Sequence, residues 1–291
     1  MIWRNMDQKT LDDAYNQRVY APNFQQILGR YEQNSERARQ RLGQPQRRHY
    51  GPAPTEGLDL FLCDQPAAPI QIFIHGGAWR SGSARSYAFP AEMFRAAGAH
   101  WLVPDFSWVQ DVGDSLLPIA DQVRRAVAWV YQHATDFGGD PGRIFLSGHS
   151  SGAHLAAVIL TTDWAGTFGL PPDIIKGGLC CSGMYDLAPV RLSARGNYIA
   201  FTDEMEAALS PQRQLDQLRT PLIVACGTEE TPEFQRQARE FVSVARAAGK
   251  DVQLLIGDGY NHFEILETLA NPFGLLGRAV LSQMGLMNRF Q

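Results

Sequence analysis

Along the chain, segments with one of two patterns of apolar and polar residues follow one another. Short runs rich in β-branched and aromatic residues predict buried strands, and they occupy 58–62, 70–74, 99–105, 143–147, 174–181, 221–226 and 252–256. Apolar residues at helical spacing, or an alanine-rich composition, predict helices at 89–97, 116–133, from 151 onward and at 232–248. Strands that alternate with helices indicate an α/β fold with a mostly parallel central sheet and helices on both faces.

The N-terminal part of the chain is more polar than the rest. Residues 7–42 have a helical pattern, in which Asp7 is suited to cap the first segment and Pro22 to open a second. We therefore expect residues 1–49 to form a helical arm that lies over the main domain, at the active-site mouth. The main domain spans 50–291, and its irregular segment at about 183–211 is expected to be a lid insertion.

Size and charge limit the possible partners. The chain has 291 residues, enough for one large domain, and a net charge of -4, which gives no cationic surface for nucleic acid. The sequence shows neither a secretory signal pattern nor an apolar run of membrane-spanning length, so we expect a cytoplasmic protein without a membrane partner. The cysteines lack disulfide or metal-ligand spacing, which predicts reduced core thiols and no metal; they are Cys63, Cys180, Cys181 and Cys226.

A glycine-bracketed serine provides the first candidate for chemistry. Residues 148–152 read Gly-His-Ser-Ser-Gly, a G-x-S-x-G pattern in which a sharp strand-to-helix turn exposes the serine hydroxyl. An ordinary turn is the alternative. The predicted strand directly before the pattern and the predicted helix directly after it favour Ser150 as a nucleophile.

A second glycine-rich turn, His-Gly-Gly-Ala-Trp at 75–79, follows the buried strand 70–74. Acyl transfer develops negative charge on the former carbonyl oxygen, which fixed backbone N–H groups stabilise. We expect an oxyanion hole here, made of Gly76, Gly77, Ala78 and Ser151. The N–H groups of Gly77, Ala78 and Ser151 would be the donors, and Gly76 would shape the turn. A plain glycine turn is the alternative for an isolated motif of this kind.

The partners of such a serine follow it in the order acid, then histidine. Glu229 and Glu230 both lie in the loop after strand 221–226, and local sequence favours Glu230 without excluding Glu229. His262 follows the last predicted strand and is the candidate base.

Aromatic residues cluster where ligands bind in open α/β folds, at the carboxyl edge of the predicted sheet. Trp79 follows strand 70–74, and Trp108 lies in the loop after strand 99–105. Both are candidate walls of a substrate pocket. Packing in the core or at the rim is the alternative for each of them.

With these residues in place, the chain resembles the α/β-hydrolase superfamily and, within it, the kynurenine formamidase (arylformamidase) group. The likeness runs nearly from end to end, and its most specific segments are 11–18, 75–79, 148–155, 182–187, 232–237 and 261–263. Two positions depart from the group's usual pattern. Ser151 stands where alanine is common, and Glu230 stands where aspartate is usual. This alignment supports Glu230 as the acid of a Ser150–Glu230–His262 triad.

The resemblance implies a cofactor-independent serine hydrolase that acts on a small molecule through an acyl-enzyme. The implied substrates are aryl formamides such as N-formylkynurenine, with Trp79, Phe106 and Trp108 contacting the aromatic ring. A carboxylesterase or amidase for other small acyl esters or anilides is the alternative. A binding module without activity would not need nucleophile, oxyanion loop and histidine together. The oligomeric state stays open, with a homodimer as the candidate assembly.

Overall fold

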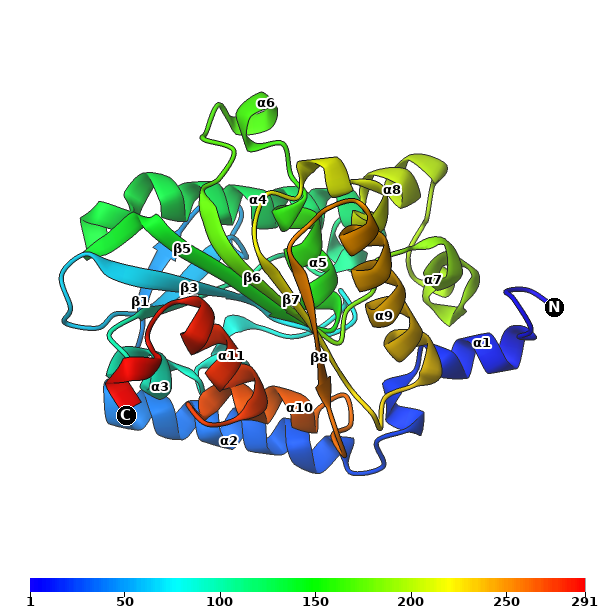
Figure 1. Cartoon of the computed structure of the whole chain (residues 1–291), viewed down its shortest axis with the longest axis horizontal. Helices are drawn as coiled ribbons and strands as arrows, with labels where there is room; N and C mark the ends of the chain where they lie inside the picture. Colours follow the sequence, from blue (N-terminus) through cyan, green and yellow to red (C-terminus); the bar gives the residue numbers. More distant parts are fainter. Residues whose placement is uncertain (291) are drawn as a thin grey trace.

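An eight-stranded sheet forms the centre of the molecule in the computed structural model, which describes residues 1–290 (Figure 1). The strands are β1 Gln46–His49, β2 Gly57–Phe61, β3 Ala68–Ile74, β4 His100–Pro104, β5 Gly139–His149, β6 Ile175–Cys181, β7 Leu222–Gly227 and β8 Val252–Gly257. Their order across the sheet is β1-β2-β4-β3-β5-β6-β7-β8. Only the β1–β2 and β2–β4 pairs of this sheet are antiparallel. The predicted fold class is therefore confirmed.

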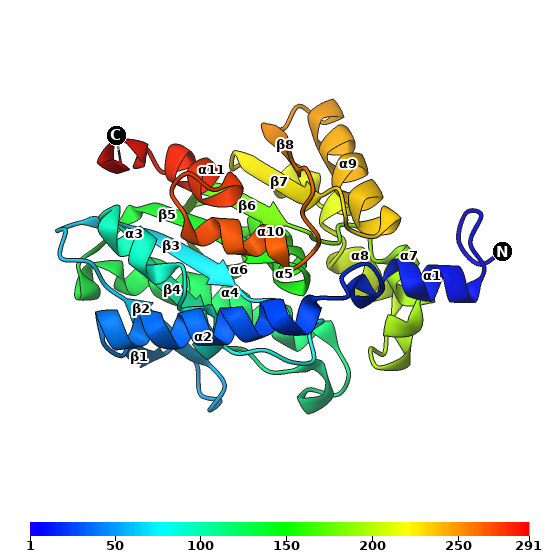
Figure 2. The same cartoon turned by 90° about the horizontal axis from the view of Figure 1, so that it is seen from below.

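Helices cover both faces of the sheet, because alternate residues of each buried strand point to opposite sides. The main helices are α2 Phe24–Leu42, α3 Ala91–Ala96, α4 Leu116–His133, α5 Ser151–Leu160, α9 Pro232–Ala247, α10 Glu264–Glu267 and α11 Leu275–Gln283. One core joins α4, α5 and α9 to the sheet, and a second joins α2, α3, α10 and α11. Figure 2 shows α2 lying along the face of the sheet that α3, α10 and α11 also cover. Within residues 1–290, no helix is both long and apolar enough to cross a bilayer.

The N-terminal arm contains two helices, in line with the two helical segments expected within residues 7–42. It consists of α1 Gln8–Ala14, a 3₁₀ turn at Gln17–Val19 and α2. Asp7 caps α1 as predicted, by accepting a hydrogen bond from the Thr10 N–H. The second segment was expected to open at Pro22; α2 begins two residues later, at Phe24, after a turn in which the Phe24 N–H donates to the Ala21 carbonyl at 3.0 Å. β1 pairs with β2, so the sheet already includes residues 46–49.

The segment after β6 is irregular, as its sequence suggested. It holds the short helices α7 Ala188–Leu192 and α8 Asp203–Ala208, joined by a 3₁₀ turn at Ala194–Asn197. This segment lies beside α1 (Figure 1), where the α1 side chain of Asp12 accepts a hydrogen bond from the Ala194 N–H at 2.6 Å. The arm and the segment that we expect to act as a lid are therefore neighbours. Another short helix, α6 Trp164–Phe168, follows α5.

Candidate active site

The serine of the G-x-S-x-G pattern lies at a sharp corner between β5 and α5. Its backbone angles are φ 58 and ψ -124, a conformation that is strained for any residue with a side chain. The corner is held by the Ser150 N–H, which donates to the Cys181 carbonyl at 2.9 Å. Close packing of α5 on β3 requires glycine at position 152, because a Cβ there would lie 2.1 Å from the Ile74 carbonyl oxygen. The strained turn predicted for Ser150 is thus present.

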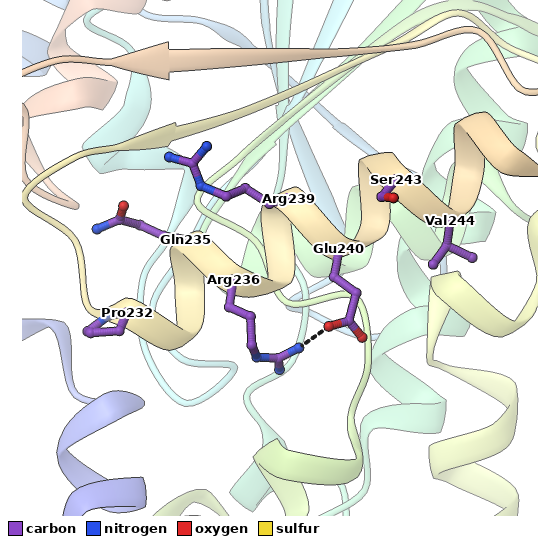
Figure 3. A pocket seen from close by; sticks show the side chains of 7 residues that line it. All are labelled: Pro232, Gln235, Arg236, Arg239, Glu240, Ser243 and Val244. Carbon is purple, nitrogen blue, oxygen red and sulfur yellow. Dashed lines mark hydrogen bonds and ion pairs between the residues drawn. The ribbon is translucent and has the colours of Figure 1, made fainter. Parts of the chain in front are cut away.

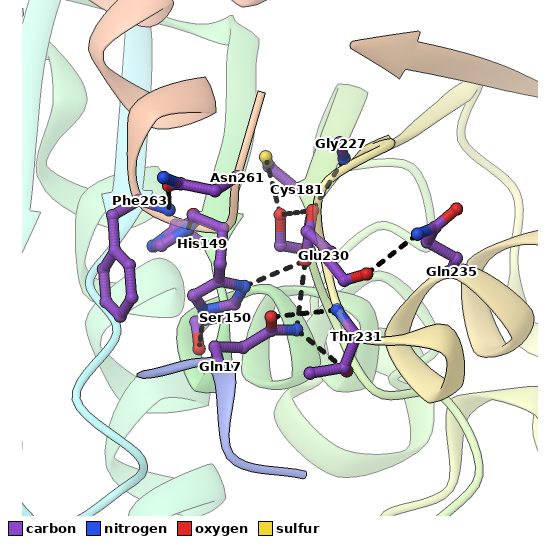
Figure 4. Close-up of polar contacts among 12 residues, drawn as sticks. Gln17, His149, Ser150, Cys181, Gly227, Glu230, Thr231, Gln235, Asn261 and Phe263 are labelled. Carbon is purple, nitrogen blue, oxygen red and sulfur yellow. Dashed lines mark hydrogen bonds and ion pairs between the residues drawn. The ribbon is translucent and has the colours of Figure 1, made fainter. Parts of the chain in front are cut away.

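Three side chains from three loops form a hydrogen-bonded line (Figure 4). Ser150 Oγ lies 2.9 Å from His262 Nε2, and His262 Nδ1 lies 2.9 Å from Glu230 Oε2. All three residues follow parallel strands at the carboxyl edge of the sheet. When Nδ1–H donates to the carboxylate, Nε2 is left as the acceptor for the serine hydroxyl. This is the tautomer that a general base needs.

The carboxylate of Glu230 is enclosed and well supported. The residue is only 1% exposed, and its Oε1 accepts hydrogen bonds from Ser182 Oγ and the Gly227 N–H, both at 2.7 Å. Gln17 Nε2 lies 3.3 Å from the Oε2 atom that also faces His262. A buried carboxylate with this many donors is fixed in direction, which suits it to orient an imidazole.

The neighbouring Glu229 is exposed to solvent. Its backbone N–H donates to the Tyr260 carbonyl at 3.1 Å, and this bond ties the loop after β7 to the loop after β8. Of the two glutamates that compete in the sequence, the structure thus brings Glu230 to His262 and leaves Glu229 outside.

The His75–Trp79 turn lies against the serine. A Cβ at Gly76 would be 3.2 Å from Ser150 Cβ, which shows how closely this loop approaches the nucleophile. Gly77, Ala78 and Trp79 all have positive φ, at 122, 55 and 60. A side chain at Gly77 would also collide with the Ser81 carbonyl oxygen, 2.0 Å away. The turn therefore requires glycine at position 77, and its backbone leaves the extended conformation of β3 beside Ser150.

Ser151, the residue that departs from the alanine common in the group, connects this loop to α5. Its Oγ accepts a hydrogen bond from the Trp79 N–H at 3.3 Å, and the residue is only 2% exposed. Its hydroxyl therefore stabilises the His75–Trp79 turn. The Ser151 N–H lies in the first turn of α5, and its role as an oxyanion donor stays a prediction.

The three aromatic residues expected at the substrate differ in exposure. Trp79 is buried, and its Nε1–H donates to His154 Nδ1 at 3.2 Å. Phe106 is also buried and stacks on the His75 ring, with 4.3 Å between centroids. Trp108 is 40% exposed. Trp79 and Phe106 pack as core residues in this structure, so their contact with a substrate ring stays a prediction, whereas Trp108 has accessible surface.

Three further residues form hydrogen bonds to His262 or Glu230, and the sequence did not indicate these contacts. His149 Nε2 lies 2.7 Å from the His262 carbonyl oxygen, while Ser182 and Gln17 contact Glu230. Ser182 directly follows β6 at the carboxyl edge of the sheet, a position that could have indicated its role. Gln17 lies in segment 11–18 of the family resemblance, but nothing in that segment indicates a partner 213 residues away.

Buried histidines make this fold sensitive to acid. Burial lowers the pKa of His149 to about 3 and that of His154 to about 4, whereas both titrate near 6.5 when unfolded. Below pH 6.5 the unfolded chain therefore binds protons that the folded chain does not, and stability falls as the pH falls. Their full contribution is present above about pH 6.5 and is lost progressively toward pH 4.

We expect the free energy of unfolding, measured with urea, to drop by roughly 2 kcal/mol per buried histidine between pH 7 and pH 5. The exposed His49 provides the control, and a His49→Gln variant should keep the wild-type dependence on pH. A stability that is unchanged between pH 7 and pH 5 would contradict this prediction.

An open hollow on α9 is separate from the serine (Figure 3). Its walls are the side chains of Pro232, Gln235, Arg236, Arg239, Glu240, Ser243 and Val244. Arg236 and Glu240, one turn apart on α9, form an ion pair at 2.7 Å. Ser150, Glu230 and His262 are not among the residues that line this hollow. They lie at the carboxyl edge of the sheet.

Comparisons with known proteins agree with this geometry. A family model described as BD-FAE matches residues 58–168. Kynurenine formamidase of Danio rerio is 31% identical over 296 residues, which cover 97% of this chain and 98% of that protein. Esterase LipQ of Mycobacterium tuberculosis is 28% identical and covers 69% of this chain and 52% of its own. A crystal structure from Silicibacter sp. TM1040, of a protein with suggested thioesterase activity, has a TM-score of 0.81 at 24% identity and covers 96% of this chain and 98% of its own.

The mostly parallel sheet, together with a serine at a strained corner and a histidine–carboxylate pair beside it, defines an α/β-hydrolase. With serine at this corner the chain is a serine hydrolase, and the relatives named above, a kynurenine formamidase and an esterase, are hydrolytic enzymes by name. Within this class, the chain belongs to the kynurenine formamidase family, because its likeness to the Danio rerio protein extends over almost the full length of both chains. The family expected from the sequence is thereby confirmed.

Proposed function

We propose that Ser150, His262 and Glu230 form a catalytic triad that hydrolyses aryl formamides through an acyl-enzyme. The observation that carries this proposal is the unbroken line of hydrogen bonds, 2.9 Å from Ser150 Oγ to His262 Nε2 and 2.9 Å from His262 Nδ1 to Glu230 Oε2. The serine needs such a base because a neutral hydroxyl is a weak nucleophile.

The reaction has two steps. Ser150 Oγ attacks the carbonyl carbon while His262 Nε2 takes its proton, and the charge on the carbonyl oxygen is stabilised by backbone N–H groups of Gly77, Ala78 and Ser151. His262 then gives the proton to the leaving amine as the C–N bond breaks. Water, activated by His262, attacks the acyl-enzyme in the same way, releases the acid and restores Ser150.

The formamide is the preferred substrate class because of the family relationship. The Danio rerio relative that matches nearly the whole chain is a kynurenine formamidase, and the exposed Trp108 provides an aromatic surface for the ring of an aryl amine. An esterase acting on small acyl esters is the alternative, which the likeness to esterase LipQ supports. Both activities would use the same triad and the same oxyanion loop.

The size of the acyl group separates the two activities. We expect kcat/KM for N-formyl-L-kynurenine to exceed the values for p-nitrophenyl acetate and p-nitrophenyl butyrate by at least about 100-fold, because a site shaped for formyl excludes larger acyl groups. The comparison is made by steady-state kinetics, with the Ser150→Ala protein as the blank. Turnover of the esters through Ser150, with the formamide untouched, would show that the triad is correct and the substrate is wrong.

A further inference from the structure

The N-terminal arm reaches the carboxylate of the proposed triad. Gln17, in the 3₁₀ turn between α1 and α2, is only 5% exposed. Its Nε2 lies 3.3 Å from Glu230 Oε2 and 3.3 Å from Thr231 Oγ1, and its Oε1 accepts the Thr231 N–H at 3.1 Å. The amide of Gln17 thus bonds both to the acid and to the residue after it (Figure 4).

The same arm also contacts the loop that carries His262, on both sides of the histidine. Asn261 Nδ2 donates to Asn23 Oδ1 at 3.0 Å, directly before His262. Directly after it, the hydroxyl of Tyr31 in α2 donates to the Phe263 carbonyl. One continuous segment of the chain therefore spans the loops of the base and the acid.

The arm is fixed in this place by further buried contacts with the loop after β7 and with α9. Thr231 Oγ1 donates to the Ala14 carbonyl at 2.7 Å. The hydroxyl of Tyr15 donates to Glu233 Oε2 at 3.1 Å and accepts from Gln237 Nε2 at 2.8 Å. Gln237 in turn accepts the Tyr185 N–H at 2.6 Å, at the start of the segment expected to form the lid. The arm is therefore integrated with the site rather than attached to a remote surface.

We propose that Gln17 is a positioning residue of the catalytic machinery, through which the N-terminal arm holds the triad carboxylate in line with His262. This inference rests on the proposed triad. Glu230 Oε2 has two donors, His262 Nδ1 and Gln17 Nε2, whereas Oε1 is held by the β6 and β7 ends of the sheet. Gln17 is the contact by which residues far from the sheet fix the atom that faces the imidazole.

The proposal predicts an effect on turnover rather than on substrate binding. Gln17→Leu removes the donor to Glu230, and with it the acceptor of the Thr231 N–H, while it retains a side chain of similar length. The carboxylate is then less constrained toward Nδ1. We expect kcat for N-formyl-L-kynurenine, or for the best ester substrate, to fall by roughly tenfold to 100-fold, as for loss of a hydrogen bond to a charged group. KM should change less than about twofold. Gln25→Leu, at an exposed position of α2, is the matched control and should behave as wild type.

A double-mutant cycle separates positioning from simple docking of the arm. In a Glu230→Ala background the acceptor is absent, so adding Gln17→Leu should lower kcat by less than about twofold more. The same fold loss in both backgrounds would overturn the proposal, as would wild-type kcat in the Gln17→Leu protein. If Gln17→Leu does not fold, Gln17→Asn replaces it as a shorter amide that stays polar, and wild-type kcat in that variant overturns the proposal.

Failure of this inference can be told from failure of the proposed function by including Ser150→Ala in the same assay. If Ser150→Ala retains activity, the triad itself is wrong. If Ser150→Ala is inactive and Gln17→Leu matches Gln25→Leu, the triad stands and only the role assigned to Gln17 is wrong.

Discussion

Replacing Ser150 by alanine is expected to lower kcat by roughly 10⁵- to 10⁶-fold while the protein stays folded. Removing the nucleophile of a triad abolishes the acyl-enzyme route and leaves only what the oxyanion donors and substrate binding contribute. The corner itself should persist, because its geometry depends on Gly152 and on the Ser150 N–H bond to Cys181 rather than on the hydroxyl. The measurement is single-turnover kinetics with N-formyl-L-kynurenine and with p-nitrophenyl acetate.

Ser243→Ala is the matched control, since Ser243 is an exposed serine on α9. It should retain wild-type rates and wild-type Tm. If the Ser150→Ala protein retained its turnover, the acyl-enzyme mechanism would have to be abandoned. If the protein were a binding module that has kept the hydrolase fold, the wild type itself would show no turnover that depends on Ser150.

The second large effect is expected at the acid. Glu230→Gln should lower kcat by roughly 10⁴-fold, because a neutral amide neither stabilises the imidazolium formed during attack nor enforces the tautomer with hydrogen on Nδ1. The enclosure of this carboxylate leaves no room for solvent to replace it, since the residue is 1% exposed. Steady-state kinetics on the purified variant, with circular dichroism to confirm folding, tests the prediction.

The adjacent glutamate provides the control for this substitution. Glu229→Gln makes the same chemical change one residue earlier, at an exposed position, and should alter kcat by less than about twofold. A large loss in Glu229→Gln together with near-normal activity in Glu230→Gln would contradict the assignment. Equal losses in both would indicate that the loop, rather than one carboxylate, had been disturbed.

The fold by itself does not select the substrate. The Silicibacter structure overlays with a TM-score of 0.81 at only 24% identity, so very different sequences build the same sheet and helix layers. Specificity in such folds resides in the loops at the carboxyl ends of the strands. In this protein those loops include Trp108 and residues 183–211, which lie beside α1. A kinetic comparison of acyl groups is therefore more informative about substrate than any further comparison of folds.

Local sequence was enough to predict seven of the eight strands, the helices α3, α4, α5 and α9, and the serine and the histidine of the hydrogen-bonded line. The buried strands were predicted because their apolar runs are continuous, and α4 was predicted with its observed bounds, Leu116–His133, because its apolar stripe has helical spacing. Ser150 was a candidate because it lies between a predicted strand and a predicted helix, and His262 because it lies in the loop after the last predicted strand. Two helical segments were expected within residues 7–42, and the structure has α1 and α2 there, although α2 begins at Phe24 rather than at Pro22.

The tertiary structure decided what depends on distant residues. Glu229 and Glu230 are chemically identical neighbours, and only the path of the loop after β7 turns one inward to His262 and the other to solvent. From the sequence Trp79 could line a pocket or pack in the core, and only the packed structure shows that it is buried with its Nε1–H donating to His154. The contact between Gln17 and Glu230 joins residues 213 positions apart. Periodicity describes the neighbours of a residue along the chain, whereas such contacts arise only when separate elements pack together.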